Sequence, residues 1–80
     1  MTMADLIYNV DELFLRKYKK EFNRERLEEV LAPFVEEYGE SEVLTACRIA
    51  CNGYKTATEA VRKIGGILHN RNKLYDDLFR

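Results

Sequence analysis

The chain has 80 residues, of which 46% are hydrophobic and 34% charged, and its formal net charge is −1. This length allows one domain, residues 1–80, near the lower limit for a self-sufficient core, and the composition is typical of a globular chain. No apolar run is long enough for a membrane span. The acidic residues Asp5, Asp11 and Glu12 stand where a secretory signal would need basic ones.

Charge alternates in blocks along the chain. Residues 16–26 carry a net charge of +4, residues 27–42 of −6 and residues 43–75 of +5. Such blocks suit electrostatic matching between segments or molecules, whereas a uniformly basic chain is typical of a nucleic-acid binder. Ordinary solvated helix faces explain the blocks equally well.

The first predicted helix runs from about Ala4 to Phe22. Its apolar residues recur at three- and four-residue spacing, which predicts one buried stripe. The stripe consists of Leu6, Val10, Leu13, Phe14 and Tyr18. Asn9 could instead cap a separate helix that begins near Val10, so one helix and two helices both remain open.

The second predicted helix runs from about Arg24 to Tyr38, with Asn23 as its N-cap. It has the clearest amphipathic pattern of the chain, formed by Leu27, Val30, Leu31, Phe34, Val35 and Tyr38. Pro33 lies inside it and removes one backbone hydrogen bond, which predicts a kink or a break just before Pro33. Gly39 is expected to end the helix with a left-handed backbone.

The third predicted helix runs from about Ser41 to Asn52 and ends at Asn52-Gly53. Its inner stripe is Val43, Cys47, Ala50 and Cys51, followed by Tyr54. Two cysteines four residues apart and one histidine do not supply the four ligands of a structural zinc site. A disulfide across one helical turn is geometrically poor. Both cysteines are therefore expected to be reduced core residues of a cytoplasmic protein.

The fourth predicted helix begins with a capping box, Thr56-Ala57-Thr58-Glu59. Gly65-Gly66 interrupts it, which predicts close packing of another backbone, or a bend. Its apolar face is Ala57, Ala60, Val61, Ile64, Ile67 and Leu68, and the period resumes at Leu74, Tyr75, Leu78 and Phe79. No segment shows strand alternation, so the sequence predicts an all-α fold, a compact bundle of about four helices.

The chain lacks the residue sets of the common catalytic sites. His69 is its only histidine, and Gly65-Gly66 lacks the strand and the Lys-Ser/Thr of a phosphate-binding loop. The adjacent carboxylates Glu36-Glu37 and Asp76-Asp77 are typical of solvated faces rather than metal sites. We therefore expect no catalytic, metal or cofactor-binding residues, no enzyme activity, and a protein that works by binding.

A helix-turn-helix DNA reader is one alternative, built from the third helix, a turn at residues 52–55 and the fourth helix. Arg62 and Lys63 would then face the groove of a DNA duplex, with Thr56 and Thr58 beside them. The competing interpretation is a pair of antiparallel helices packed in a bundle, which the near-zero net charge favours.

Several short motifs in the second half resemble a known family. They are Phe34-Val35-Glu36-Glu37-Tyr38-Gly39, Val43-Leu44-Thr45-Ala46, Asn52-Gly53 and Ile64-Gly65-Gly66-Ile67-Leu68-His69-Asn70. Together they resemble the C-terminal DnaD/DnaB-like domain of Firmicute and phage replication-initiation proteins. The resemblance covers about residues 13–75.

This resemblance implies a helical domain that helps to load a replicative helicase, binds single-stranded DNA and self-associates. The family's last helix carries a Tyr-x-x-x-Ile-x-x-x-Trp pattern linked to DNA binding. The matching positions are Lys63, Ile67 and Arg71, so both aromatic positions are basic in this chain. Phosphate contacts would replace base stacking there.

The predicted nucleic-acid-binding residues are Arg62, Lys63, Ile67, Arg71 and Lys73. The expected partners are single-stranded DNA, replication proteins and a second copy of the chain, with no membrane. The alternative is a helical protein–protein interaction or oligomerisation domain without a nucleic-acid role. The acidic block 27–42, between two basic blocks, motivates that alternative.

Overall fold

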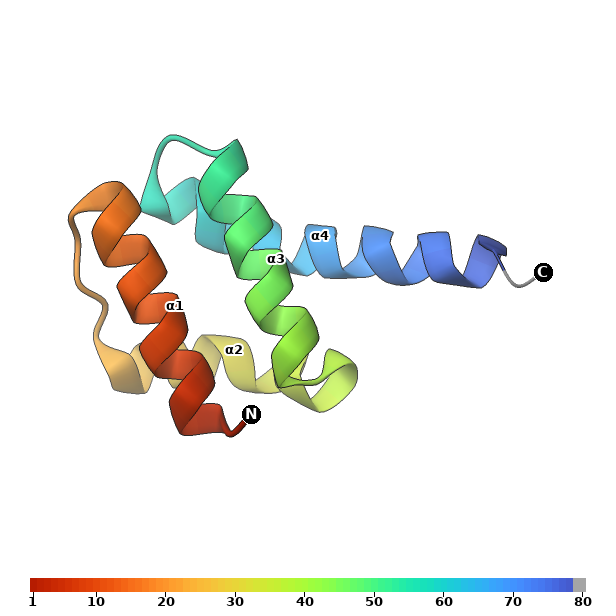
Figure 1. Ribbon diagram of the computed structural model, residues 1–80, viewed down its shortest axis with the longest axis horizontal. Helices are drawn as coiled ribbons and strands as arrows, with labels where there is room; N and C mark the ends of the chain where they lie inside the picture. The colour runs from red at the N-terminus through yellow and green to blue at the C-terminus, as the bar shows by residue number, and fades with distance from the viewer. Residues whose placement is uncertain (79–80) are drawn as a thin grey trace.

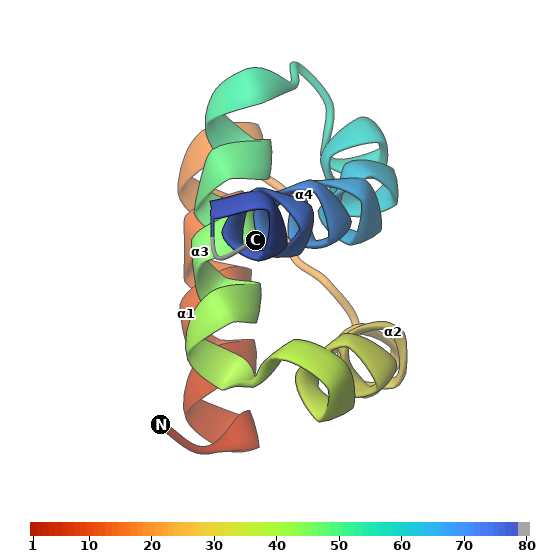
Figure 2. The same cartoon turned by 90° about the vertical axis from the view of Figure 1, so that its right-hand side faces the viewer.

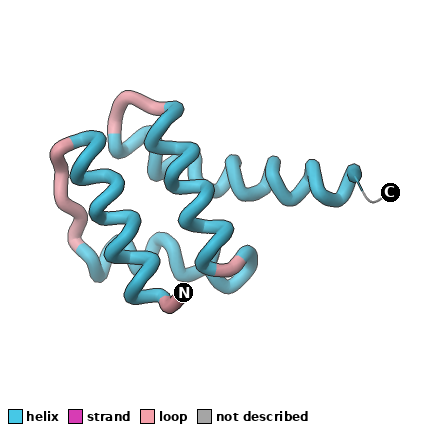
Figure 3. Tube along the Cα trace, in the orientation of Figure 1, coloured by secondary structure: helices cyan, strands magenta, loops and turns pink. Residues whose placement is uncertain are grey.

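The computed structural model describes the backbone of residues 1–78 and the side chains of residues 1–73. Its elements are four α-helices: α1 (Met3–Tyr18), α2 (Arg24–Tyr38), α3 (Glu40–Gly53) and α4 (Ala57–Leu78) (Figure 1). Short loops join them, and the described residues contain no strand (Figure 3). The predicted all-α bundle is therefore confirmed.

The helices form two layers. α1 and α3 lie side by side, while α2 and α4 cross the same side of that pair (Figure 2). The core between the layers is apolar, and no polar or charged side chain among the described residues is buried. Its largest fully buried members are Phe14, Leu6, Leu31, Ile64, Leu68, Val10, Val43 and Cys47. Cys47 and Cys51 are both buried and unbridged, as the sequence predicted.

α1 is one helix, so the alternative of two helices is wrong. Thr2 and Asp5 form a capping box at its start, and the Asn9 side chain donates to the Asp5 carbonyl within the helix. The helix ends at Tyr18 rather than near Phe22, because Lys19 adopts a left-handed backbone with φ 60°. Residues 19–23 form a loop that turns back along α1.

α2 runs continuously through Pro33, so a break before Pro33 is wrong, while a kink there stays a prediction. The Asn23 side chain accepts from the Arg26 amide, which confirms the predicted cap. Gly39 ends α2 as expected, but its φ of 85° and ψ of 160° differ from the expected left-handed helical conformation and form a combination open essentially to glycine. Its amide donates to Val35 and its carbonyl accepts from Val43, so one residue closes α2 and opens α3.

α4 begins with the predicted cap, in which the Thr56 hydroxyl accepts from the Glu59 amide at 3.2 Å. The helix continues through both glycines. A Cβ atom at Gly65 would lie 3.2 Å from the Phe34 ring, whereas one at Gly66 would meet no atom within 4 Å. The close packing predicted here therefore involves Gly65 alone and a side chain of α2.

The direction of α4 differs from the antiparallel packing of the third and fourth helices that the sequence suggested. α4 runs across α3 in both views rather than antiparallel to it, and its second half projects from the bundle (Figures 1 and 2). Leu68 is the last buried residue of α4 among the described side chains. The apolar residues predicted to resume the period, Leu74, Tyr75, Leu78 and Phe79, lie outside the described side chains.

Candidate nucleic-acid interface

The outer face of α4 is polar and basic. Ala60, Ile64 and Leu68 face the core, which turns the opposite side of the helix to solvent. The exposed residues on that side are Thr58, Glu59, Arg62, Lys63, Gly66, His69, Asn70 and Lys73. Three of the five predicted binding residues, Arg62, Lys63 and Lys73, are therefore accessible to a ligand.

The other two predicted residues have different surroundings. Ile67 is partly buried against the core. The Arg71 guanidinium donates to Glu42 of α3, with 2.6 Å between Nε and Oε1, and both side chains are about two-thirds covered. A phosphate at Arg71 would have to compete with that carboxylate. The structure thus does not bring all five residues together on one exposed face.

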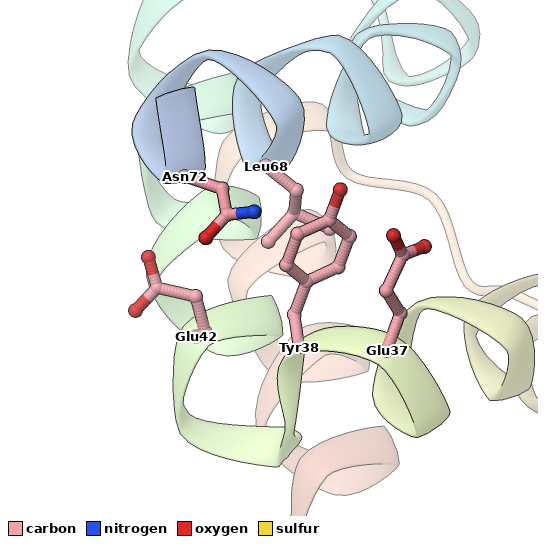
Figure 4. A pocket seen from close by; sticks show the side chains of 5 residues that line it. All are labelled: Glu37, Tyr38, Glu42, Leu68 and Asn72. Carbon is pink, nitrogen blue, oxygen red and sulfur yellow. The ribbon is translucent and has the colours of Figure 1, made fainter. Parts of the chain in front are cut away.

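An acidic hollow of about 300 Å³ lies beneath this flank of α4. Figure 4 shows the Tyr38 ring between Glu37 and Glu42, below Leu68 and Asn72 of α4. Desolvation raises the pKa of the Tyr38 hydroxyl, and the Glu37 carboxylate raises it further. The Glu37 carboxylate is exposed there, whereas the Glu42 carboxylate is paired with Arg71.

A second hollow, of about 340 Å³ and here called the basic groove, borders the first turns of α4. The α1–α2 loop forms one wall and the first turns of α4 form the other. The residues that line it are Lys20, Glu21, Phe22, Ala57, Thr58, Val61 and Arg62. Lys20 and Arg62 are exposed, while Phe22 is partly buried. The groove therefore combines apolar side chains with two cations, Lys20 and Arg62, and one carboxylate, Glu21.

Tertiary contacts place Phe22 in the basic groove. Its amide donates to the Asp11 carboxylate at 3.3 Å, and its ring lies 4.9 Å from the Phe14 ring between centroids. The sequence interpretation missed Lys20 and Phe22 because it assigned both to the end of a helix. The family resemblance also directs attention to aromatic residues on the last helix, whereas this aromatic residue belongs to a loop.

The remaining reactive side chains do not form a shared site. His69 is exposed, whereas Cys47 and Cys51 lie in the core. Burial raises the pKa of the Cys47 thiol to about 12, which disfavours its nucleophilic thiolate form. Within residues 1–73 no group of three His, Cys, Asp or Glu side chains could hold a metal ion.

Two further findings bear on the class of protein. Across the described residues, no helix is both long enough and apolar enough to cross a membrane. Comparison of the chain with models of known protein families, with curated proteins and with solved structures finds no match.

Proposed function

We propose that this chain is a binding module for single-stranded DNA, rather than an enzyme. The observation that carries the proposal is the basic groove, which Phe22 lines together with the cations Lys20 and Arg62 and the carboxylate of Glu21. The outer face of α4, with Lys63 and Lys73, extends the same basic surface along the helix. The DnaD-like resemblance supports the same function and adds a helicase-loading protein as a second partner.

The chemistry of a single strand suits this arrangement. Lysine and arginine side chains attract phosphates without regard to sequence, and the attraction weakens with salt. An aromatic ring beside them offers a stacking surface, and base stacking contributes about 1–3 kcal/mol per base. Within the described residues, no ion pair engages Lys20, Arg62, Lys63 or Lys73. These cations can therefore meet phosphates without first releasing a carboxylate.

A duplex-DNA reader is the second candidate, favoured by the connection between α3 and α4. Only residues 54–56 separate the two helices, and α4 crosses α3, as in a helix-turn-helix unit (Figure 1). Thr58, Arg62 and Lys63 would then enter the major groove. The exposed carboxylate of Glu59 in the same turn opposes this function, because it would approach the phosphates.

Gel-shift titration with single-stranded and duplex DNA, at about 0.05 M and about 0.2 M salt, distinguishes these functions. We expect tighter binding of the single strand, weakened by salt and by the double substitution Lys20→Ala/Arg62→Ala. The matched control is Arg26→Ala/Arg48→Ala, which removes the same charge from exposed positions outside the groove. The substitution Lys63→Ala/Arg71→Ala tests the sequence-predicted pair in the same way.

Each remaining outcome has a clear meaning. Tighter binding of the duplex would favour the helix-turn-helix function. No binding at low salt would exclude DNA as a partner and leave the protein–protein interaction domain as the function.

A further inference from the structure

Gly66 is an exposed glycine inside a helix, and no contact within the described part of the chain requires a glycine there. A Cβ atom at Gly66 would meet no atom within 4 Å, whereas one at Gly65 would lie 3.2 Å from the Phe34 ring. Gly39 is the only glycine with a positive φ among the described residues, so the backbone at Gly66 is open to other residue types. Glycine in a helix interior is less favourable than alanine. Neither packing nor backbone conformation therefore explains the glycine at this position.

Gly66 lies at the centre of the side of α4 that faces away from the core. Successive residues of an α-helix are about 100° apart around its axis, so Gly66 is about 160° from both Ile64 and Leu68. Those two side chains are fully buried. The residues one turn before and after Gly66 are all exposed, and they are Arg62, Lys63, His69 and Asn70. Gly66 thus leaves the helix backbone uncovered in the middle of a polar surface.

Positive charge predominates around Gly66. Arg62 and Lys63 precede it by one turn, and Lys73 lies on the same side of the helix, about 10 Å further along the axis. Among the described side chains of α4, Glu59 is the one carboxylate, and it lies about 10 Å in the opposite direction. No described ion pair occupies the three cations. An anion at Gly66 would therefore lie close to unpaired positive charge on both sides.

A phosphodiester suits this position better than a helix of a partner protein. A helix that crosses closely at a glycine needs apolar side chains around the crossing, to pack against. The large hydrophobic side chains that are exposed in the described structure all lie outside α4, and they are Met1, Tyr8, Leu15, Val30 and Ile49. A strand of nucleic acid instead needs cations and a close approach to the protein surface, which a glycine permits.

We propose that the phosphodiester backbone of a bound strand lies directly against α4 at Gly66, between the two cations of the preceding turn and Lys73. This inference rests on the proposed single-stranded DNA function and adds the position that the strand follows along the helix. The face differs from that of the family's aromatic pattern, because Ile67 is partly buried and Arg71 is paired with a carboxylate of α3. A side chain at Gly66 would hold the strand away from the cations.

Fluorescence anisotropy with a labelled oligothymidine of about 16 nucleotides, at about 0.05 M salt, tests the proposal. We expect Gly66→Leu to weaken binding by about tenfold or more, the effect of losing one charge-assisted contact. Gly66→Ala should weaken binding by a smaller factor while it raises the melting temperature. A role of Gly66 in folding alone would not separate affinity from stability in this way.

The matched control is Gly53→Leu. Gly53 is also exposed, lies at the end of α3 and has no atom within 4 Å of an added Cβ atom. This variant should bind the strand as the wild type does. Circular dichroism and thermal melting confirm that each variant is folded.

A strand of the same length that keeps its phosphodiesters but lacks all bases identifies the group that lies at Gly66. We expect the wild type to bind this abasic strand more weakly than oligothymidine, because no base can stack. Gly66→Leu should lower both affinities by the same factor. An effect of Gly66→Leu on oligothymidine alone would place a base at Gly66 and overturn the proposal.

The remaining outcomes separate this inference from the proposed function. A wild-type chain that binds oligothymidine no better than Gly66→Leu does would leave the DNA function standing and overturn the position of the strand, as would an equal loss in Gly53→Leu. A wild-type chain that binds no strand at low salt would overturn both.

Discussion

Gly65 and Gly66 are adjacent in sequence but differ in their surroundings. A methyl group at Gly66 would enter open space, while one at Gly65 would press on the Phe34 ring at 3.2 Å. Glycine inside a helix is less favourable than alanine by about 1 kcal/mol, so each position carries the same propensity cost. Substitution by alanine would remove this cost at either position, but at Gly65 the added methyl group would crowd the Phe34 ring.

We therefore expect Gly66→Ala to stabilise the protein by about 1 kcal/mol, which corresponds to a rise in melting temperature of roughly 4–8 °C. Gly65→Ala should gain less or destabilise, because the Phe34 ring must move. Thermal unfolding of the two variants side by side is the measurement, and each serves as the control for the other. Equal gains at both positions would show that Phe34 is not packed against Gly65.

Cys47 is a second residue whose environment can be measured, through the pKa of its thiol. Burial raises its pKa from 9.0 to about 12, and the neighbouring Cys51 contributes in the same direction. A group whose pKa is higher in the folded state than in the unfolded chain makes its full contribution to stability at pH values below the unfolded-state pKa, here about 9. That contribution is lost as the pH rises from about 9 toward 12.

Between pH 8 and pH 10.5 we expect the free energy of unfolding to fall by about 2 kcal/mol from this thiol alone. Urea denaturation of wild-type protein and Cys47→Ala at both pH values isolates the effect. The alanine variant also lacks a buried side chain, but that loss is independent of pH. The same pH dependence in both proteins would contradict the burial of this thiol.

At the scale of elements, one hydrogen bond joins the end of α1 to the α3–α4 connection. The Tyr18 hydroxyl donates to the Tyr54 carbonyl at 2.7 Å and lies 3.4 Å from the Cys51 carbonyl. Its pKa is raised, first by desolvation, which is consistent with a hydroxyl that donates rather than ionises. This contact joins the end of α1 to the residues that lead from α3 into α4.

We expect Tyr18→Phe to lower the free energy of unfolding by about 1 kcal/mol, the usual contribution of one internal hydrogen bond. Tyr8→Phe is the matched control, since Tyr8 is exposed and its hydroxyl has no bond among those described; its effect should stay within about 0.5 kcal/mol. Chemical denaturation compares the two. An unchanged stability in Tyr18→Phe would mean that water replaces the bond without loss.

Three of the four helices could be predicted because their start signals are local. Asn23 and Thr56 cap α2 and α4, and Gly39 separates α2 from α3. The end of α1 was missed because no glycine or proline follows Tyr18. There the chain turns through interactions made with Asp11 and Phe14, which lie 8 to 11 residues earlier and give no local signal.

The candidate site likewise has some features that could be predicted from the sequence and others that could not. The exposure of Arg62, Lys63 and Lys73 follows from helical periodicity, which also accounts for the buried stripe of α4. The pairing of Arg71 with Glu42 and the approach of Phe22 to α4 join segments 29 or more residues apart. Such approaches depend on how the helices cross, which a single sequence does not specify.

At the scale of the whole molecule, the charge blocks of the sequence become separate surfaces. The acidic block lies on α2 and at the start of α3, where it forms the hollow around Tyr38 (Figure 4). Four basic residues, Lys20, Arg62, Lys63 and Lys73, lie in the basic groove and along the outer face of α4, where Glu21 and Glu59 are also exposed. A net charge near zero therefore does not mean that each surface of the molecule is neutral.

The most direct test of the account is a nuclear magnetic resonance titration of the labelled chain with a single-stranded oligonucleotide at low salt. We predict that the backbone amide shifts concentrate in residues 19–22 and 57–73, and that they shrink in Lys20→Ala/Arg62→Ala and at high salt. An absence of shifts, or shifts confined to the acidic helix α2, would contradict the account.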